Sequence, residues 1–153
     1  MTISTSAGIK FNIGPAQAVT EFADDTSAIT ALSALIYTSV GEIEDAGEIG
    51  DEAGTQTFTA LGNRRVRKVK TTFDAGTQTL MLGLDRADAG QIAMKAALKS
   101  DENFAFKIEY PDGETDYYVG QVTSFRDQIG SAESIRKAST AVAINSAVFT
   151  DAA

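Results

Sequence analysis

The chain of 153 residues contains no cysteine, no histidine and no tryptophan. The first two absences exclude a thiolate nucleophile, an imidazole base and a soft-metal site. Zinc hydrolases, Ser-His-Asp hydrolases and Cys-His enzymes are therefore excluded as well. No disulfide framework can hold the fold together. Carboxylate chemistry and the binding of hard cations by oxygen ligands are what the composition leaves open.

Positive charge is scarce, since 13 Lys and Arg residues stand against 21 Asp and Glu residues and give a net charge of -8. Binding nucleic acid without regard to sequence requires a basic surface, which this balance disfavours. The sequence has no run of 18 or more apolar residues that would cross a membrane. Its first residues lack the charged and apolar regions of a signal peptide. We expect no membrane partner, and a protein that starts in the cytoplasm where it is made.

Length and hydrophobic content indicate one globular domain over residues 1–153. The length fits the common size of a domain, and hydrophobic residues make up 43% of the chain. A chain of this size buries about 68–70% of its unfolded surface, so it needs neither a disulfide nor a metal to fold. The first seven residues are small and polar, which predicts a flexible N-terminal arm over about 1–7.

Alternation of apolar and polar residues, the pattern of half-buried strands, recurs along the chain. It is found at residues 9–13, 55–59, 77–85, 104–110, 115–125 and 134–149. Residues 36–49 are strand-like at first and continue as an exposed, kinked strand and loop, and residues 64–73 form a basic strand in which Val66 and Val69 are three apart. The turn Pro111-Asp112-Gly113 predicts a hairpin between two of these strands. The turn Asp74-Ala75-Gly76 predicts a second hairpin, between 64–73 and 77–85. Residues 15–35 follow neither period, and both a short helix and a strand with a loop stay open there.

One helix is predicted at 87–100, where good helix formers follow Asp85 and Asp88, either of which can cap its start. The remainder reads as about six to seven strands. The predicted fold is therefore mainly β, a β-sandwich or open barrel with one flanking α-helix.

Two clusters of opposite charge lie about a dozen residues apart. The acidic cluster consists of Glu42, Glu44, Asp45, Glu48, Asp51 and Glu52. It lacks the spacing of an EF-hand, which favours a solvated surface over a cation site. The basic cluster is typical of a solvated or edge-protecting strand face, but opposite clusters also pair head-to-tail between copies of one protein. Both readings stay open. The candidate inter-subunit charge contacts are Glu42, Glu44, Asp45, Glu48, Arg64, Arg65, Arg67, Lys68 and Lys70.

No catalytic, cofactor-binding or metal-binding residue is assigned. The chain has no phosphate-binding G-x-x-x-x-G-K-[ST] loop and no G-x-G-x-x-G after a strand. Its aspartates sit in turns and caps, where the backbone alone favours them. We expect a protein that is not an enzyme and needs no cofactor.

From Val40 onward the order of these features resembles the tail tube (major tail) protein family of siphophages. The residues that carry the resemblance are VGEIEDAGEIG at 40–50, TFTALGNRRVRKVKTTFDAGTQTLML at 57–82, DRADAGQIAMKAALKSDENFAFKIEYPDG at 85–113 and YYVGQVTSFRDQIGSAESIRKASTAVAINS at 117–146. No single motif is specific, because none is catalytic, and the resemblance lies in their succession over about two-thirds of the chain.

The resemblance implies a subunit that self-assembles into hexameric rings, stacked into a hollow tube through which DNA passes without specific binding. It implies as partners other copies of the chain, tail-initiation and tail-terminator proteins and a tape measure protein, in a virion tail assembled in the host bacterial cytoplasm. The strands at 36–50, 55–72 and 134–149 are then expected to line the channel with acidic or neutral polar side chains. The alternative is a virion decoration or adhesion β-domain that does not polymerise. A metal-dependent carboxylate enzyme ranks third.

Overall fold

The computed structural model describes residues 3–152 and is mainly β, as predicted. It contains more elements than expected, because short strands and a second helix join those that the sequence indicated. In chain order they are β1 (Lys10–Ala16), α1 (Asp25–Ser33), β2 (Thr38–Val40), β3 (Ile43–Asp45), β4 (Glu52–Phe58), β5 (Arg67–Asp74), β6 (Thr77–Gly83), α2 (Ala89–Lys99), β7 (Phe104–Glu109), β8 (Thr115–Gln128), β9 (Lys137–Ile144) and β10 (Phe149–Asp151). The predicted arm at 1–7 has no helix or strand over residues 3–7, and residues 1–2 lie outside the described part.

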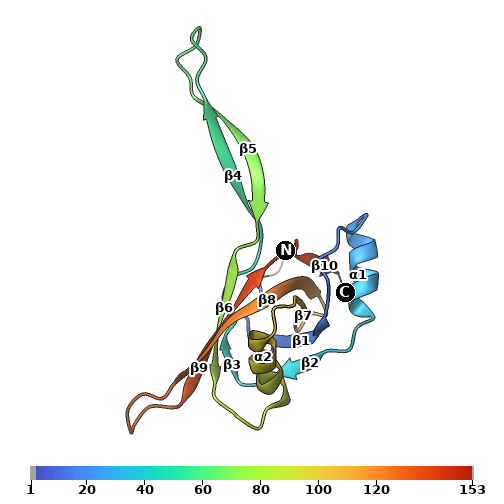
Figure 1. Cartoon of the computed structure of the whole chain (residues 1–153), viewed down its shortest axis with the longest axis vertical. Helices are drawn as coiled ribbons and strands as arrows, with labels where there is room; N and C mark the ends of the chain where they lie inside the picture. The colour runs from blue at the N-terminus through green and yellow to red at the C-terminus, as the bar shows by residue number, and fades with distance from the viewer. Residues whose placement is uncertain (1–2, 153) are drawn as a thin grey trace.

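One antiparallel sheet of eight strands forms the body of the molecule (Figure 1). Its strand order is β2-β1-β7-β8-β9-β6-β3, with β10 paired to β8 beyond the end of β9. Only Gly41 and Glu42 separate β2 from β3 in the chain, yet these two strands lie at opposite edges of the sheet. The sheet must therefore curl until its edges approach each other, which makes it an open barrel with a seam at these two residues.

The main core lies on the inner face of the curled sheet. Phe11, Phe106 and Tyr118 stack there in a row across β1, β7 and β8, with ring centroids 5.7 and 5.5 Å apart. The alternation predicted for the last strand is confirmed, since Ala138, Thr140, Val142 and Ile144 are all buried. The strand ends at Ile144 rather than at 149. The Asn145 amide still donates to the Val119 carbonyl, but the Val119 amide donates to the Ser146 side chain instead of to the backbone, so the ladder stops there.

The ambiguous stretch 15–35 contains the end of β1 and the helix α1. The Asp24 side chain caps α1 by accepting a 2.7 Å hydrogen bond from the Ser27 amide, and this bond lowers the pKa of the Asp24 carboxyl. Ala28 and Leu32 are buried against a second, smaller core on the outer face of β7 and β8. The sequence did not reveal this helix because only a narrow side of it is buried.

The helix predicted at 87–100 is confirmed as α2, which begins at Ala89 and ends at Lys99. Its capping residue is Asp88, whose Oδ2 accepts hydrogen bonds from the Gln91 amide at 3.0 Å and from the Gly41 amide at 3.1 Å. A Cβ on Gly90 would collide with the Ser39 carbonyl, so only glycine permits this close approach of α2 to β2. The helix therefore braces the seam of the barrel.

The hairpin predicted between 64–73 and 77–85 is wrong. β5 pairs with β4, and together they form a separate two-stranded sheet that projects far from the body (Figure 1). β6 instead pairs with β9 along its whole length and with β3 at its end. The turn at 74–76 is present, with Asp74 Oδ1 accepting from the Gly76 amide at 2.8 Å. It redirects the chain from one sheet into the other rather than folding it back.

Candidate assembly surfaces

The projecting hairpin, residues 52–74, exposes large apolar side chains. They are Phe58, Leu61, Val66, Val69 and Phe73, and each of them is more than half exposed. Its strands hydrogen-bond to each other and belong to no larger sheet. An isolated two-stranded hairpin is marginally stable in water at best. The hairpin is therefore suited to being covered by another molecule.

The basic cluster lies on the distal half of this hairpin. Arg67, Lys68 and Lys70 are on β5, while Arg64 and Arg65 are in the loop before it, and all five are exposed. The strand alternation turns Lys68 and Lys70 to one face, where threonines of β4 lie opposite them. None of the salt bridges found within residues 3–152 involves these five side chains.

The acidic cluster lies near the root of the hairpin and along the seam of the barrel, and all its candidate residues are exposed. Glu42 occupies the corner between β2 and β3 with a left-handed φ of 62°. Glu44 forms a salt bridge of 2.9 Å with Lys137 of β9. Asp45 accepts a 2.8 Å hydrogen bond from the Gly47 amide, and Glu48 lies in the loop that leads to β4. The structure thus places the two clusters at opposite ends of the hairpin and does not bring them together within one chain.

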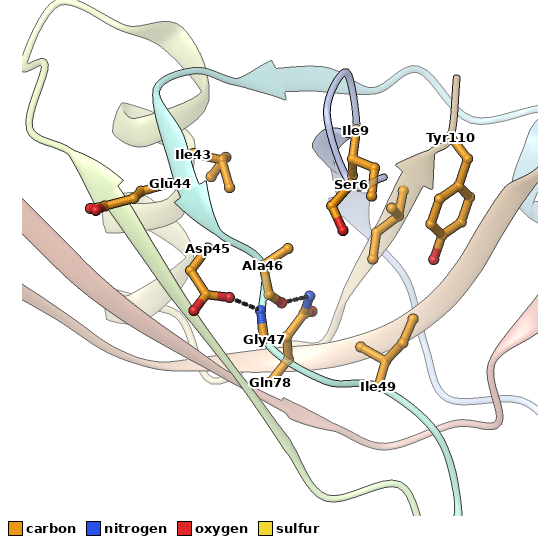
Figure 2. Close-up of a pocket in the computed structure, with 11 residues that line it drawn as sticks. Ser6, Ile9, Ile43, Glu44, Asp45, Ala46, Gly47, Ile49, Gln78 and Tyr110 are labelled. Carbon is orange, nitrogen blue, oxygen red and sulfur yellow. Dashed lines mark hydrogen bonds between the residues drawn. The ribbon is translucent and has the colours of Figure 1, made fainter. Parts of the chain in front are cut away.

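A pocket of about 310 Å³ opens beside this acidic cluster (Figure 2). Its lining combines aliphatic side chains with the acidic residues Glu44 and Asp45. The aliphatic residues that line it are Ile9, Ile43, Ala46, Ile49 and Ile108.

A buried amide makes part of the pocket wall rigid. The Gln78 side chain donates a 2.7 Å hydrogen bond to the Ala46 carbonyl and accepts one from the Tyr118 hydroxyl. Burial raises the pKa of Tyr118 well above its ordinary value. Sequence reasoning missed this pocket, although a glutamine on the apolar face of the strand at 77–85 was a sign of a buried polar network.

A second surface is the outward face of β6, β8 and β9, which we call the small-residue face. It consists of Thr77, Thr79, Met81, Gln121, Ser124, Ser139, Ala141 and Ala143. These eight positions lie in register across the three strands and carry no charge. At one end of the face Arg126 lies in the same row as Ser139 and Met81, and Lys137 lies in the next outward row, where it is paired with Glu44.

Within residues 3–152 no cluster of three or more acidic side chains is placed to hold a metal ion. No helix in that range is long and apolar enough to cross a membrane. What the molecule offers is an exposed arm, a pocket at the base of that arm and a broad sheet face, which are features of a subunit that binds other protein surfaces.

The model of the lambda phage tail tube protein family matches residues 21–148. The chain belongs to this family. It is thus a tube-forming structural subunit of a virion tail, and the resemblance seen in the order of its sequence features is confirmed. The match covers α1 and the projecting hairpin, including segments for which the sequence alone left two readings open.

Solved structures of tail and tube proteins share the fold of this tail tube protein. The sheath/tube terminator of the extracellular contractile injection system PVC superposes with a TM-score of 0.70 at 10% identity, over 99% of both chains. The tail of the empty GTA particle gives 0.62 at 16% identity, over 76% of this chain and 87% of that one. The SPP1 tail tube gives 0.59 at 12% identity, over 95% and 77%. Comparison with curated protein sequences finds no significant match.

Proposed function

We propose that copies of this chain form hexameric rings that stack into a hollow tail tube, and that DNA passes through the tube without being bound. Tube formation follows from the family, while the six-fold ring is supported by the tail of the empty GTA particle, which was refined with C6 symmetry. The alternative of a decoration or adhesion domain that does not polymerise has no observation in its favour.

The observation that carries the proposal is the small-residue face. A surface past which DNA slides must not hold phosphates, because each phosphate contact adds steeply to the affinity. The eight positions of this face carry no charge, and its cations, Arg126 and Lys137, are confined to one end, where Lys137 is paired with Glu44. We assign this face to the channel wall. Of the three strands expected there, we retain 134–149. We assign 55–72 to the contacts between copies instead, and 36–50 is not part of this face.

We further propose that the acidic and basic clusters pair between copies. Glu42, Glu44, Asp45 and Glu48 of one copy would then face Arg64, Arg65, Arg67, Lys68 and Lys70 of the next. The clusters lie at opposite ends of the hairpin, so a copy displaced along the hairpin brings the basic tip of one chain to the acidic root of the next. Repeated in one direction, this heterologous contact builds extended assemblies. Each exposed pair contributes about 1 kcal/mol or less, but repetition around a ring multiplies the effect.

The remaining expectations belong to the same proposal. As partners we propose tail-initiation and tail-terminator proteins and a tape measure protein, with assembly in the cytoplasm of a bacterial host. We also propose that the chain has no catalytic activity, which the lack of cysteine and histidine supports.

Electron microscopy and sedimentation of the purified chain over a concentration series test this proposal. We expect rings and then tubes as the concentration rises, because the hairpin exposes unpaired strand edges and apolar side chains. We also expect the tubes not to retain double-stranded DNA at physiological salt. A species that stays monomeric up to millimolar concentration and forms no rings contradicts the assembly, and tight, salt-sensitive DNA binding by the tubes contradicts the assignment of the channel wall.

A further inference from the structure

We propose that Leu61, at the tip of the projecting hairpin, inserts into the pocket beside the acidic cluster of a second copy of this chain. The proposal deepens the charge pairing given above and rests on the proposed assembly. It names a specific contact, a leucine held in an aliphatic socket, that the charges alone do not define.

Leu61 is the most exposed large apolar side chain of the chain among the described residues, and it sits in the turn between β4 and β5. The Leu61 side chain does not contribute to the core of its own chain, so binding to another copy would bury it without breaking contacts within the fold. Arg64 and Arg65 follow three and four residues later in the loop, and the Arg65 amide donates a 3.0 Å hydrogen bond to the Asn63 side chain. The tip therefore presents an apolar knob with positive charges beside it.

The pocket has the complementary chemistry. Ile9, Ile43, Ile49 and Ile108 provide an aliphatic lining that accepts a leucine. Glu44 and Asp45 belong to the same lining (Figure 2). Glu44 is paired with Lys137, whereas Asp45 forms no salt bridge within residues 3–152, so Asp45 is the carboxylate that offers a partner to an arginine near Leu61. Its wall is set by the Gln78 hydrogen bonds to Ala46 and Tyr118, so the socket exists before a partner arrives.

The position of the pocket allows the same contact to form between each copy and the next. Ile49 lines the pocket and lies just before β4, so the socket is at the root of the hairpin while the knob is at its tip. The chain from Ile49 to Leu61 spans at most roughly 40 Å at about 3.3 Å per residue. A second copy displaced by up to that length along the hairpin presents its own socket to the tip, and its own tip to a third copy. The contact is heterologous and builds a stack.

Because the chain has no cysteine, a pair of introduced cysteines reports this contact without background. In the variant with Leu61→Cys and Ala46→Cys, oxidation of assembled tubes should link successive copies and give a ladder on a non-reducing gel. Each single variant should give no ladder. The pair Leu61→Cys and Ile135→Cys is the matched control, because Ile135 is an exposed apolar residue in the loop between β8 and β9, away from the pocket.

A second measurement does not depend on cysteine at the pocket. Leu61→Asp should raise the protein concentration needed for tube formation by about tenfold or more, since a leucine side chain would lose its burial. Ile36→Asp places the same change on an exposed isoleucine outside the hairpin and should leave that concentration unchanged.

The outcomes separate the two proposals. A ladder in the 61/46 pair with a weakened Leu61→Asp variant supports the contact. Wild-type tubes with no ladder in that pair, a ladder in the 61/135 pair, or full assembly of Leu61→Asp overturns the contact and leaves the tube intact. Failure of the wild-type chain to form any ring or tube overturns the proposed assembly, and the contact with it.

Discussion

Removing the Asp88 carboxylate should destabilise the seam of the barrel as well as the start of α2. In the folded chain its Oδ2 caps the helix through the Gln91 amide and also accepts from the Gly41 amide of the seam. Loss of a helix cap costs about 0.5–2 kcal/mol. Leaving the partly buried Gly41 amide without an acceptor costs about 1–3 kcal/mol more. We therefore expect Asp88→Ala to lower the free energy of unfolding by about 1.5–5 kcal/mol.

Urea denaturation followed by circular dichroism, at protein concentrations below assembly, measures this loss. Asp24→Ala is the matched control, because the Asp24 side chain caps α1 through the Ser27 amide and, among the described residues, forms no hydrogen bond to another element. It should cost less than Asp88→Ala. Asp88→Asn keeps one acceptor oxygen and should fall between the wild type and Asp88→Ala. An equal decrease in the free energy of unfolding for Asp88→Ala and Asp24→Ala would refute this prediction, because the hydrogen bond from the Gly41 amide to Asp88 would then add no stability beyond that of the helix cap.

Three further predictions concern assembly, the channel and pH. Reversing Arg65 and Arg67 to Glu should weaken assembly while circular dichroism stays unchanged, and unchanged assembly in sedimentation would remove the case for charge pairing. The cross-strand pair Thr79 and Ala141, each changed to Lys, should make tubes retain DNA in a salt-sensitive way, whereas salt-independent behaviour would place the channel elsewhere. Burial raises the folded-state pKa of Tyr118 above its unfolded value of about 10. The stability that this group contributes should be fully present below pH 10 and should fall above it by about 1.4 kcal/mol per pH unit. In alkaline denaturation Tyr118→Phe should remove this part of the pH dependence, and an unchanged pH dependence would contradict the prediction.

The sequence predicted correctly those parts of the fold that depend on interactions between residues close together in the chain. The hairpin of β7 and β8 followed from alternation on both sides of a Pro-Asp-Gly turn, and α2 followed from a capping aspartate and a run of helix formers. The pairing of β5 was predicted wrongly, because alternation and a turn do not say which strand lies alongside. β6 has a stronger partner in β9, whose small and branched residues bury the same side of the sheet.

The candidate assembly surfaces were likewise predictable only in part. The charges of the two clusters are visible in the sequence, and the structure confirms that they are exposed. Their separation along the hairpin was not predictable, because it depends on β4 and β5 leaving the body. The pocket was missed because its lining comes from β3, β6, β7 and the segment before β1, which only the curling of the sheet brings together.

The five positive charges on the hairpin also bear on the direction in which copies are added. Two hairpins that meet side by side in parallel, or tip to tip, place these like charges against each other, which is unfavourable. Pairing between two arms is thereby suppressed, and addition of a copy to the root of another remains. In a stack built this way one end displays unused basic tips and the other displays unused acidic pockets. Growth then has a polarity, and the proteins that close the two ends need surfaces of opposite charge.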